Sequence, residues 1–84
     1  MATVRITPEA LRQAERLPPA IRGRIRRLVL RLARWPVVSG AKPLSGRLAG
    51  RYRVRTGDYR LQFYVRGGTV VVEKIGHRSG FYDD

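Results

Sequence analysis

The sequence predicts an α+β domain of element order βααβββ, in which a two-helix hairpin packs on one face of a small, twisted, mainly antiparallel sheet. Three observations lead to this prediction. Apolar residues recur at helical spacing in the first part of the chain, apolar and polar residues alternate after residue 50, and Gly67-Gly68 separates two of the alternating runs. At 84 residues, the chain fits one domain over residues 1–84.

The first half of the chain predicts a short strand and two helices. Residues 3–6 are β-prone, and Thr7-Pro8 supplies an N-cap and a first helical residue. A second helix is expected from about Pro19 to Arg34. Its apolar stripe comprises Ile21, Ile25, Leu28, Leu32 and Trp35, and its opposite face carries Arg24, Arg27, Arg31 and Arg34.

The second half predicts three strands after an irregular segment at 36–50. They are expected at about 51–56, 58–66 and 69–76, with turns at Gly57 and Gly67-Gly68. Alternation places Tyr52, Val54, Leu61, Phe63 and Val65 toward the helices, and Arg53, Arg55, Arg60, Gln62 and Tyr64 on the other face. The side occupied by His77 stays open, because a bulge in the last strand would reset the alternation.

The charge balance indicates a polyanionic partner. The chain has eighteen basic and six acidic residues, for a net charge of +12, and sixteen of the basic residues are arginine. Arginine suits bidentate contacts to phosphate and stacking on bases. A GC-rich genome would also raise the ratio of arginine to lysine, but it does not explain the net charge. Nucleic acid is therefore favoured over an acidic protein alone.

Composition also argues against several classes of protein. The chain has no cysteine, one histidine and six acidic residues, so neither a disulfide nor a metal or cofactor site is expected. No apolar run approaches the roughly 20 residues of a membrane span. The N-terminal residues lack the apolar core of a signal peptide, and we expect a cytoplasmic protein with no membrane partner.

Three segments rich in glycine and arginine follow one another along the chain. They are Pro43-Leu44-x-Gly46 before Leu48-Ala49-Gly50, then Tyr52-Arg53-Val54-Arg55-x-Gly57-Asp58-Tyr59-Arg60-Leu61, and finally Ile75-Gly76-His77-Arg78-x-x-x-Tyr82. In this order they resemble the RelE/ParE superfamily of toxins from type II toxin–antitoxin pairs. The resemblance spans nearly the whole chain and implies the same fold. It also implies a cognate antitoxin that forms a hetero-oligomer with the chain, which alone is expected to be monomeric.

Two activities occur in this superfamily. RelE-like members are ribosome-dependent endoribonucleases that cut mRNA in the decoding site, whereas ParE-like members inhibit DNA gyrase and generally lack the nuclease residues. The functional positions of RelE-like members correspond here to Arg53, Arg55, Arg60, Arg78 and Tyr82. Because suitable residues occupy all of them, the resemblance implies an mRNA endonuclease (an mRNA interferase), with a ParE-like gyrase inhibitor as the alternative.

Metal-free RNA cleavage requires charge stabilisation and two proton transfers. The 2′-hydroxyl attacks the adjacent phosphate, and a 2′,3′-cyclic phosphate and a free 5′-hydroxyl result. Arg60 and Arg78 suit stabilisation of the phosphate charge, and Arg53 and Arg55 suit the flanking backbone. Tyr82 is expected to stack on a base or hydrogen-bond the phosphate.

The proton-transfer group is the point at which this chain departs from its relatives. Family members often have lysine at the strand positions, but arginine keeps its proton far above neutral pH and is a poor base. His77 is then the candidate base or acid, since an imidazole has an unperturbed pKa of about 6.5. Its alternative role is only to hydrogen-bond the sheet or a phosphate.

Two further assignments stay open. Tyr64 either stacks on the substrate or packs at the rim of the core. The helix arginines (Arg24, Arg27, Arg31 and Arg34) either contact ribosomal RNA or form a solvated surface.

Overall fold

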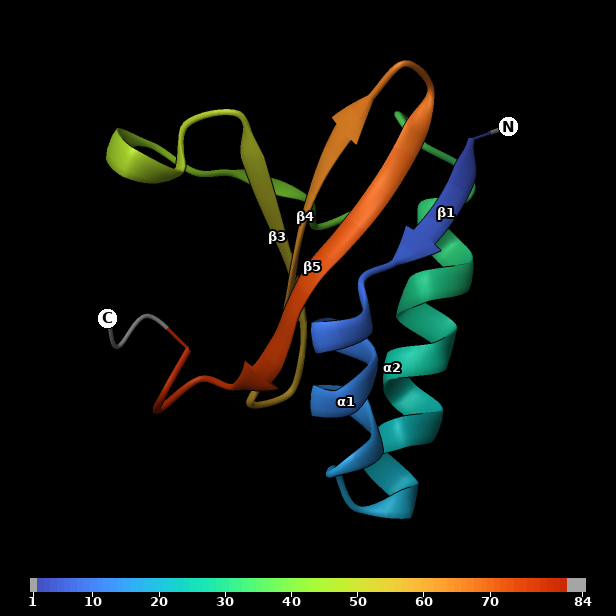
Figure 1. Ribbon diagram of the computed structural model, residues 1–84, viewed down its shortest axis with the longest axis vertical. Helices are drawn as coiled ribbons and strands as arrows, with labels where there is room; N and C mark the ends of the chain where they lie inside the picture. Colours follow the sequence, from blue (N-terminus) through green and yellow to red (C-terminus); the bar gives the residue numbers. More distant parts are fainter. Residues whose placement is uncertain (1, 82–84) are drawn as a thin grey trace.

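The computed structural model describes residues 2–81 and places two helices against one face of a five-stranded sheet (Figure 1). The elements are β1 (Thr3–Ile6), α1 (Pro8–Glu15), α2 (Pro19–Leu32), β2 (Lys42–Pro43), a 3₁₀ turn (Gly46–Leu48), β3 (Arg51–Thr56), β4 (Tyr59–Arg66) and β5 (Thr69–His77). The predicted α+β class and the order βααβββ are confirmed, with the short β2 as an addition. Within the described part of the chain, no helix is long and apolar enough to cross a membrane.

β4 begins and β5 ends one residue later than predicted, at Tyr59 and His77, and two larger differences concern the segment at 36–50 and the end of the second helix. The segment at 36–50 was expected to be irregular, but β2 pairs with β3 there through Lys42 opposite Arg53. The second helix ends at Leu32, two residues before the expected Arg34. Pro36 accounts for the early end, because a proline has no N–H to donate to the carbonyl four residues earlier, here that of Leu32, and its ring clashes with that carbonyl.

The sheet has the strand order β1-β5-β4-β3-β2 and is antiparallel except for β1, which runs parallel to β5. Gly67 and Gly68 join β4 to β5, and both have positive φ angles (53° and 79°). Two consecutive residues of this kind form the tight turn that suits the twist of a hairpin. Gly57, with φ at 60°, makes the corresponding turn between β3 and β4.

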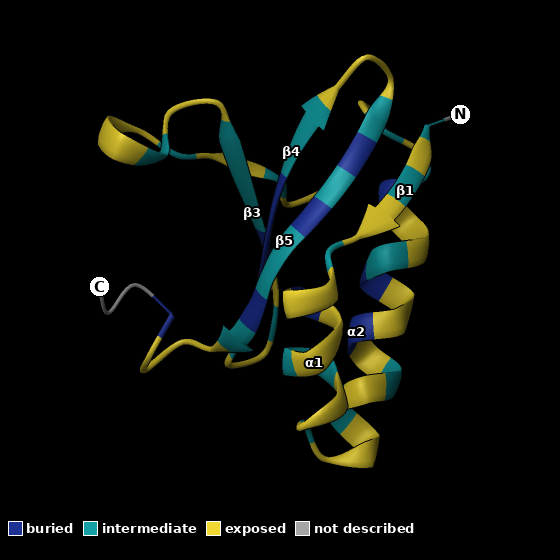
Figure 2. Ribbon diagram, viewed as in Figure 1, coloured by how far each residue is buried: buried dark blue, intermediate teal, exposed yellow. Residues whose placement is uncertain are grey.

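The hydrophobic core lies between the helices and the sheet. Phe63 is fully buried, and the Trp35 ring packs on it edge-on with the centroids 5.4 Å apart. Leu28 and Leu32 of α2 are buried against the same layer, as the apolar stripe predicted. In Figure 2, buried positions alternate with less buried ones along β5. One face of the sheet is therefore apolar and covered.

A β-bulge in β5 resets the alternation near the C-terminus. Gln62 pairs with Lys74 and Phe63 pairs with Val72, so Glu73 is the extra residue. Because of this residue, Val72 and Ile75 are both buried in the core although an odd number of positions separates them.

The bulge also decides the side on which His77 lies. His77 pairs with Tyr59, whose side chain packs against the core, and the two rings meet edge to face at 5.2 Å. His77 therefore lies on the helix side of the sheet.

One side chain of α1 fastens the helix to β5. Gln13 Oε1 accepts a hydrogen bond of 2.8 Å from the backbone N–H of Ile75, beyond the point at which β1 pairing ends at Val72. α1 begins at Pro8 with Thr7 as N-cap, whose Oγ1 accepts from the N–H of Ala10 at 3.1 Å, as predicted.

Replacing Gln13 with alanine is expected to lower the free energy of unfolding by about 1–3 kcal/mol, because the amide of the buried Ile75 loses its acceptor. Urea denaturation followed by circular dichroism measures the change. The matched control is Arg12→Ala at the adjacent exposed position, which should stay within about 0.5 kcal/mol of the parent protein. Equal losses in the two variants would contradict a specific role for this hydrogen bond.

Candidate functional site

The face of the sheet opposite the helices is strongly basic. Across the strands, Arg53 lies opposite Gln62 and Arg55 lies opposite Arg60. The strand pairing places these basic residues on the face: Arg5, Arg51, Arg53, Arg55, Arg60, Arg66 and Lys74. Among the described residues, Glu73 is the one acidic residue there. This surface, called the basic face below, is the main candidate for a functional site.

The pair formed by Arg55 and Arg60 stabilises neither strand. Like charges directly opposite each other on neighbouring strands are destabilising. In addition, Arg60 Nη1 is buried and has no hydrogen-bond partner within residues 2–81. A buried donor without an acceptor costs free energy. An anion bound between these two guanidinium groups would offset both costs.

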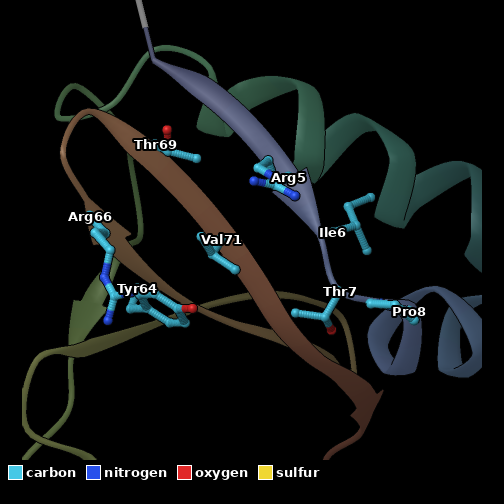
Figure 3. A pocket seen from close by; sticks show the side chains of 8 residues that line it. All are labelled: Arg5, Ile6, Thr7, Pro8, Tyr64, Arg66, Thr69 and Val71. Atoms are coloured by element: carbon cyan, nitrogen blue, oxygen red, sulfur yellow. The ribbon is translucent and has the colours of Figure 1, made fainter.

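A cleft of about 400 Å³ opens at the β1 end of the basic face. Figure 3 shows the side chains around it, which come from β1, the start of α1 and the β4–β5 hairpin. The lining residues are Arg5, Ile6, Thr7, Pro8, Tyr64, Arg66, Thr69 and Val71. The lining thus combines two guanidinium groups with a phenol ring and contains no carboxylate.

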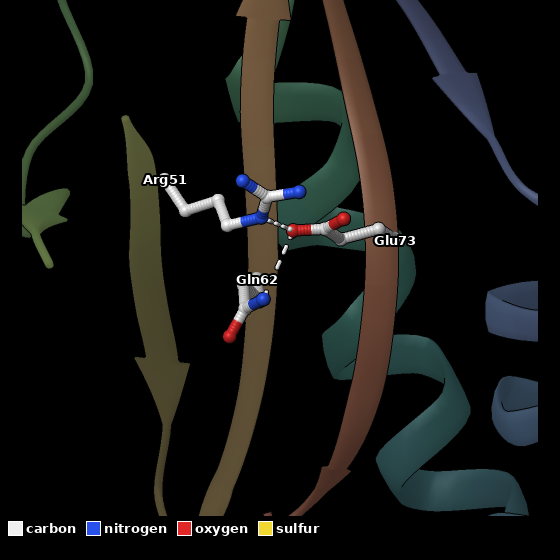
Figure 4. A network of polar contacts seen from close by, with 3 residues as sticks. All are labelled: Arg51, Gln62 and Glu73. Carbon is white, nitrogen blue, oxygen red and sulfur yellow. Dashed lines mark hydrogen bonds and ion pairs between the residues drawn. The ribbon is translucent and has the colours of Figure 1, made fainter. Parts of the chain in front are cut away.

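Glu73 organises the middle of the basic face. Its Oε2 accepts from Arg51 Nε at 2.7 Å and from Gln62 Nε2 at 2.9 Å (Figure 4). The three residues come from β3, β4 and β5, so the bulge residue ties three strands together. The Arg51 guanidinium in turn lies 5.6 Å from the centroid of the Tyr64 ring. The network holds Arg51 and Tyr64 in position.

The segment after β5 returns over the basic face. Phe81 is buried, and a side chain at Gly76 would meet its ring at 3.5 Å. Lys74 Nζ donates to the backbone carbonyl of Phe81 and lies over its ring. Because Gly76 pairs with Arg60, this contact places Phe81 beside Arg60. The predicted functional Tyr82 comes next in the chain and lies outside the described residues.

Arg78 lies at the same end of the sheet as Arg60. Its backbone N–H donates to the carbonyl of Asp58 at 2.8 Å, one residue beyond the paired ends of β4 and β5. Its Nε lies 3.8 Å from Asp58 Oδ1, and both side chains are nearly two-thirds exposed. An exposed pair at this distance is weak, and the guanidinium can exchange it for another anion.

His77 is the predicted site residue that the fold places apart from the others. It contacts Tyr59 on the helix side, whereas Arg60 lies on the basic face. Its Nδ1 accepts from the backbone N–H of Ser79 at 3.1 Å and lies 2.9 Å from Ser79 Oγ. The lone pair that a base needs is therefore engaged, and the remaining Nε2 is a donor in the neutral ring. This geometry favours the second of its two predicted roles, hydrogen bonding at the strand end.

The helix arginines continue the basic face around the β3 edge. Arg24, Arg27 and Arg31 line one cleft together with Arg55. A neighbouring cleft is lined by Arg31 of α2, Arg53 of β3 and Lys42 of β2. Arg34, the fourth predicted residue, lines neither cleft. The arrangement makes one continuous band of positive charge from α2 to β4.

Sequence reasoning missed Arg5, Lys42, Arg51, Arg66 and Lys74 as parts of these surfaces. Alternation along residues 3–6 and 51–66 already placed three of them away from the core. Their neighbours became clear only from the parallel pairing of β1 and the pairing of β2.

Comparison with known proteins gives consistent matches. Residues 4–82 match the model of a family described as the ParE toxin of the type II toxin–antitoxin system, parDE. Toxin RelG of Mycobacterium tuberculosis is 37% identical over 83 residues, which are 95% of this chain and 94% of that protein.

Solved structures agree with the sequence matches. The crystal structure of the toxin–antitoxin complex RelBE2 from M. tuberculosis contains a chain that is 36% identical, with a TM-score of 0.81 over 92% of this chain and 98% of that one. The RelB–RelE antitoxin–toxin complex from Methanococcus jannaschii has a TM-score of 0.78 at 23% identity, over 94% and 95% of the two chains, and supports the fold alone.

Replacing Glu73 with glutamine is expected to lower the free energy of unfolding by about 1–2 kcal/mol, since Arg51 loses a charged acceptor. The value is at the low end for charged hydrogen bonds because Arg51 is 38% exposed. Urea denaturation measures the change. Glu15→Gln, at an exposed position on α1, removes the same charge and should have an effect below about 0.5 kcal/mol. A loss of the same size in Glu15→Gln would show that net charge, and not the network, is responsible.

Proposed function

Because the chain belongs to the RelE/ParE family of toxins of type II toxin–antitoxin systems, we propose that it is a ribosome-dependent, metal-free endoribonuclease that cuts mRNA in the decoding site and blocks translation. One observation carries the choice of nuclease: Arg55 lies directly opposite Arg60, whose buried Nη1 has no acceptor within residues 2–81. Such an arrangement costs stability and is suited to a bound phosphate.

In this proposal the scissile phosphate binds against Arg60, at the end of the basic face covered by the C-terminal segment. The 2′-oxygen forms a bond to phosphorus, and the bond to the 5′-oxygen breaks. Arg60 stabilises the charge that develops on the non-bridging oxygens, and Arg78 joins it by leaving Asp58. Arg53 and Arg55 hold the neighbouring phosphates, and Tyr64 contacts a base.

Two protons move in the reaction, one from the 2′-hydroxyl and one to the 5′-oxygen. Phe81 lies beside Gly76, the partner of Arg60, and Tyr82, the next residue in the sequence, is proposed to contact the substrate. His77 remains the proposed base or acid, and it acts as a base only if its Nδ1 is released from Ser79. If Nδ1 is not released, water accepts and supplies these protons, and His77 only forms hydrogen bonds at the end of β5.

The ribosome is the proposed site of action. The helix arginines Arg24, Arg27 and Arg31 share a cleft with Arg55, so ribosomal RNA bound there would lie beside the mRNA on the basic face. Arg34, two residues beyond the end of α2, is proposed to contact the same RNA. This binding would make cleavage depend on the ribosome, because the ribosome holds the mRNA in register with Arg60.

The proposed protein partner is an antitoxin. The related RelBE2 and RelB–RelE structures are toxin–antitoxin complexes. An acidic segment of the antitoxin would complement the net charge of +12 on this chain. The two proteins are proposed to form a hetero-oligomer in the cytoplasm, whereas the toxin alone is monomeric.

A cell-free translation reaction tests the proposed activity against its alternative. The family model matched by the chain is that of a ParE toxin, so gyrase inhibition without nuclease activity is the competing function. We expect loss of amino-acid incorporation, with mRNA cut within codons and 2′,3′-cyclic phosphate ends. Normal translation together with inhibited DNA supercoiling by gyrase would overturn the proposal.

Arg60→Ala and Arg78→Ala are each expected to reduce mRNA cleavage on the ribosome by at least about 100-fold, because each removes stabilisation of the phosphate charge. Both variants should still bind the antitoxin, and cells that express either variant should continue to grow. Arg12→Ala, an equal charge loss on α1, should leave cleavage unchanged. Full toxicity of Arg60→Ala or Arg78→Ala at equal expression would remove that residue from the site.

His77→Gln separates the two roles of the histidine. If the imidazole is the base, the cleavage rate of the parent protein rises with pH between about 5 and 8, and the substitution flattens this rise and slows cleavage about 100-fold or more. If the imidazole is the acid, the rate of the parent protein falls over the same range. Single-turnover cleavage at a series of pH values measures the profile. If the pH profile of His77→Gln matches that of the parent protein, His77 takes no part in proton transfer and only forms its hydrogen bonds with Ser79.

A further inference from the structure

The cleft at the β1 end of the basic face is built from three strands. Arg5 on β1 lies opposite Val71 on β5, which lies opposite Tyr64 on β4. Arg66, next on the same face of β4, completes one wall. Figure 3 shows the Tyr64 ring and the two arginines around the opening, with Val71 between them. Val71 therefore supplies apolar surface between the Tyr64 ring and Arg5, and the two arginines give the opening positive charge.

The two arginines beside Tyr64 differ in how firmly their guanidinium groups are held. Arg51 is fixed by Glu73 at 2.7 Å and supports the ring from the middle of the face. Arg66 is exposed and lies 6.0 Å from the ring centroid, at the outer limit of a cation–π contact. Within residues 2–81, neither Arg66 nor Arg5 forms an ion pair. Arg66 can therefore turn from the ring to a ligand while Arg51 keeps the ring in place.

We propose that this cleft binds one unpaired nucleotide of single-stranded RNA, with the base stacked on Tyr64 and the phosphate held by Arg5 and Arg66. Any base can stack on the ring, since every base has a π-face, so the site is tolerant of sequence. The guanidinium groups match the phosphate oxygens. The inference rests on the proposed function for the class of ligand, and it adds a second contact point remote from the scissile phosphate.

The position of the cleft fits a continuous strand of RNA. Tyr64 is four residues from Arg60 along β4, about 13 Å at about 3.3 Å per residue. Both side chains lie on the same face, so one RNA strand can occupy both places. An acidic peptide would also be attracted by Arg5 and Arg66, but it would leave the supported aromatic ring without a stacking partner. The aromatic ring therefore favours RNA over a protein ligand.

The test measures binding of the full-length chain to a single-stranded 2′-O-methyl RNA of about 10 nucleotides, a length within the range that small single-strand-binding domains cover. The methyl groups block the nucleophile, so binding is measured without cleavage. Tyr64→Ala is expected to weaken binding about 5- to 100-fold, while Tyr64→Phe stays within about twofold because stacking is kept. Fluorescence anisotropy gives the dissociation constants.

The arginines have a separate readout in salt dependence. Arg5→Ala and Arg66→Ala should each weaken binding, and the variant with both substitutions should reduce the slope of log affinity against log salt by about 0.7, for the one phosphate that the pair neutralises. Arg12→Ala on α1 is the matched control and should keep the slope. Arg5 and Arg66 are exposed, so these variants test the cleft even if Tyr64→Ala lowers stability.

Two results would overturn the inference. One is RNA affinity that is unchanged in Tyr64→Ala, Arg5→Ala and Arg66→Ala. The other is a polyglutamate peptide of equal length that binds more tightly than the RNA and loses as much affinity in Tyr64→Ala, which would make the cleft a protein site. The outcome is independent of catalysis: binding that depends on Tyr64 without cleavage on the ribosome would overturn the proposed nuclease and support the cleft.

Discussion

One-sided burial is the constraint on which the rest of this structure depends. Two short helices cover only one face of a five-stranded sheet, and the core lies between them. Every second residue of β3 and β4 must then face away from the core. In this chain those residues are mainly arginines, together with a glutamine and a tyrosine. The packing that makes the domain stable therefore also displays a dense set of cations on a rigid surface.

Apart from strand pairing, few side-chain interactions stabilise the basic face. Arg55 and Arg60 repel each other across β3 and β4, and the one described carboxylate on the face, Glu73, is shared by Arg51 and Gln62. Glu73 reaches this position because it is the bulge residue of β5. The network stabilises the middle of the face, while the cations at its two ends remain available to an anion. A polyanionic partner would add stability by binding only the folded state.

In the proposed function, different parts of this surface contact different parts of the RNA. The C-terminal segment places Phe81 next to Gly76 and Arg60, which gives that end a wall of buried apolar atoms beside a guanidinium. The other end has the open cleft around Tyr64. Clefts at the β3 edge extend the charge to α2. In the proposed function, the scissile phosphate, a base and a second RNA contact different regions, and Arg53 and Arg55 lie where the mRNA and the second RNA meet.

The sequence by itself determined the local structure: helix starts such as Thr7-Pro8, the Gly67-Gly68 turn, and the faces of β3 and β4, because these depend on neighbours in the chain. The resemblance in three ordered segments also led to the family, which the comparisons confirm. Only the tertiary structure decided where His77 lies, that Arg5 joins Tyr64, and that Arg24, Arg27 and Arg31 meet Arg55. These outcomes depend on the β5 bulge, on parallel pairing of β1 and on helix packing, which bring together residues far apart in the chain.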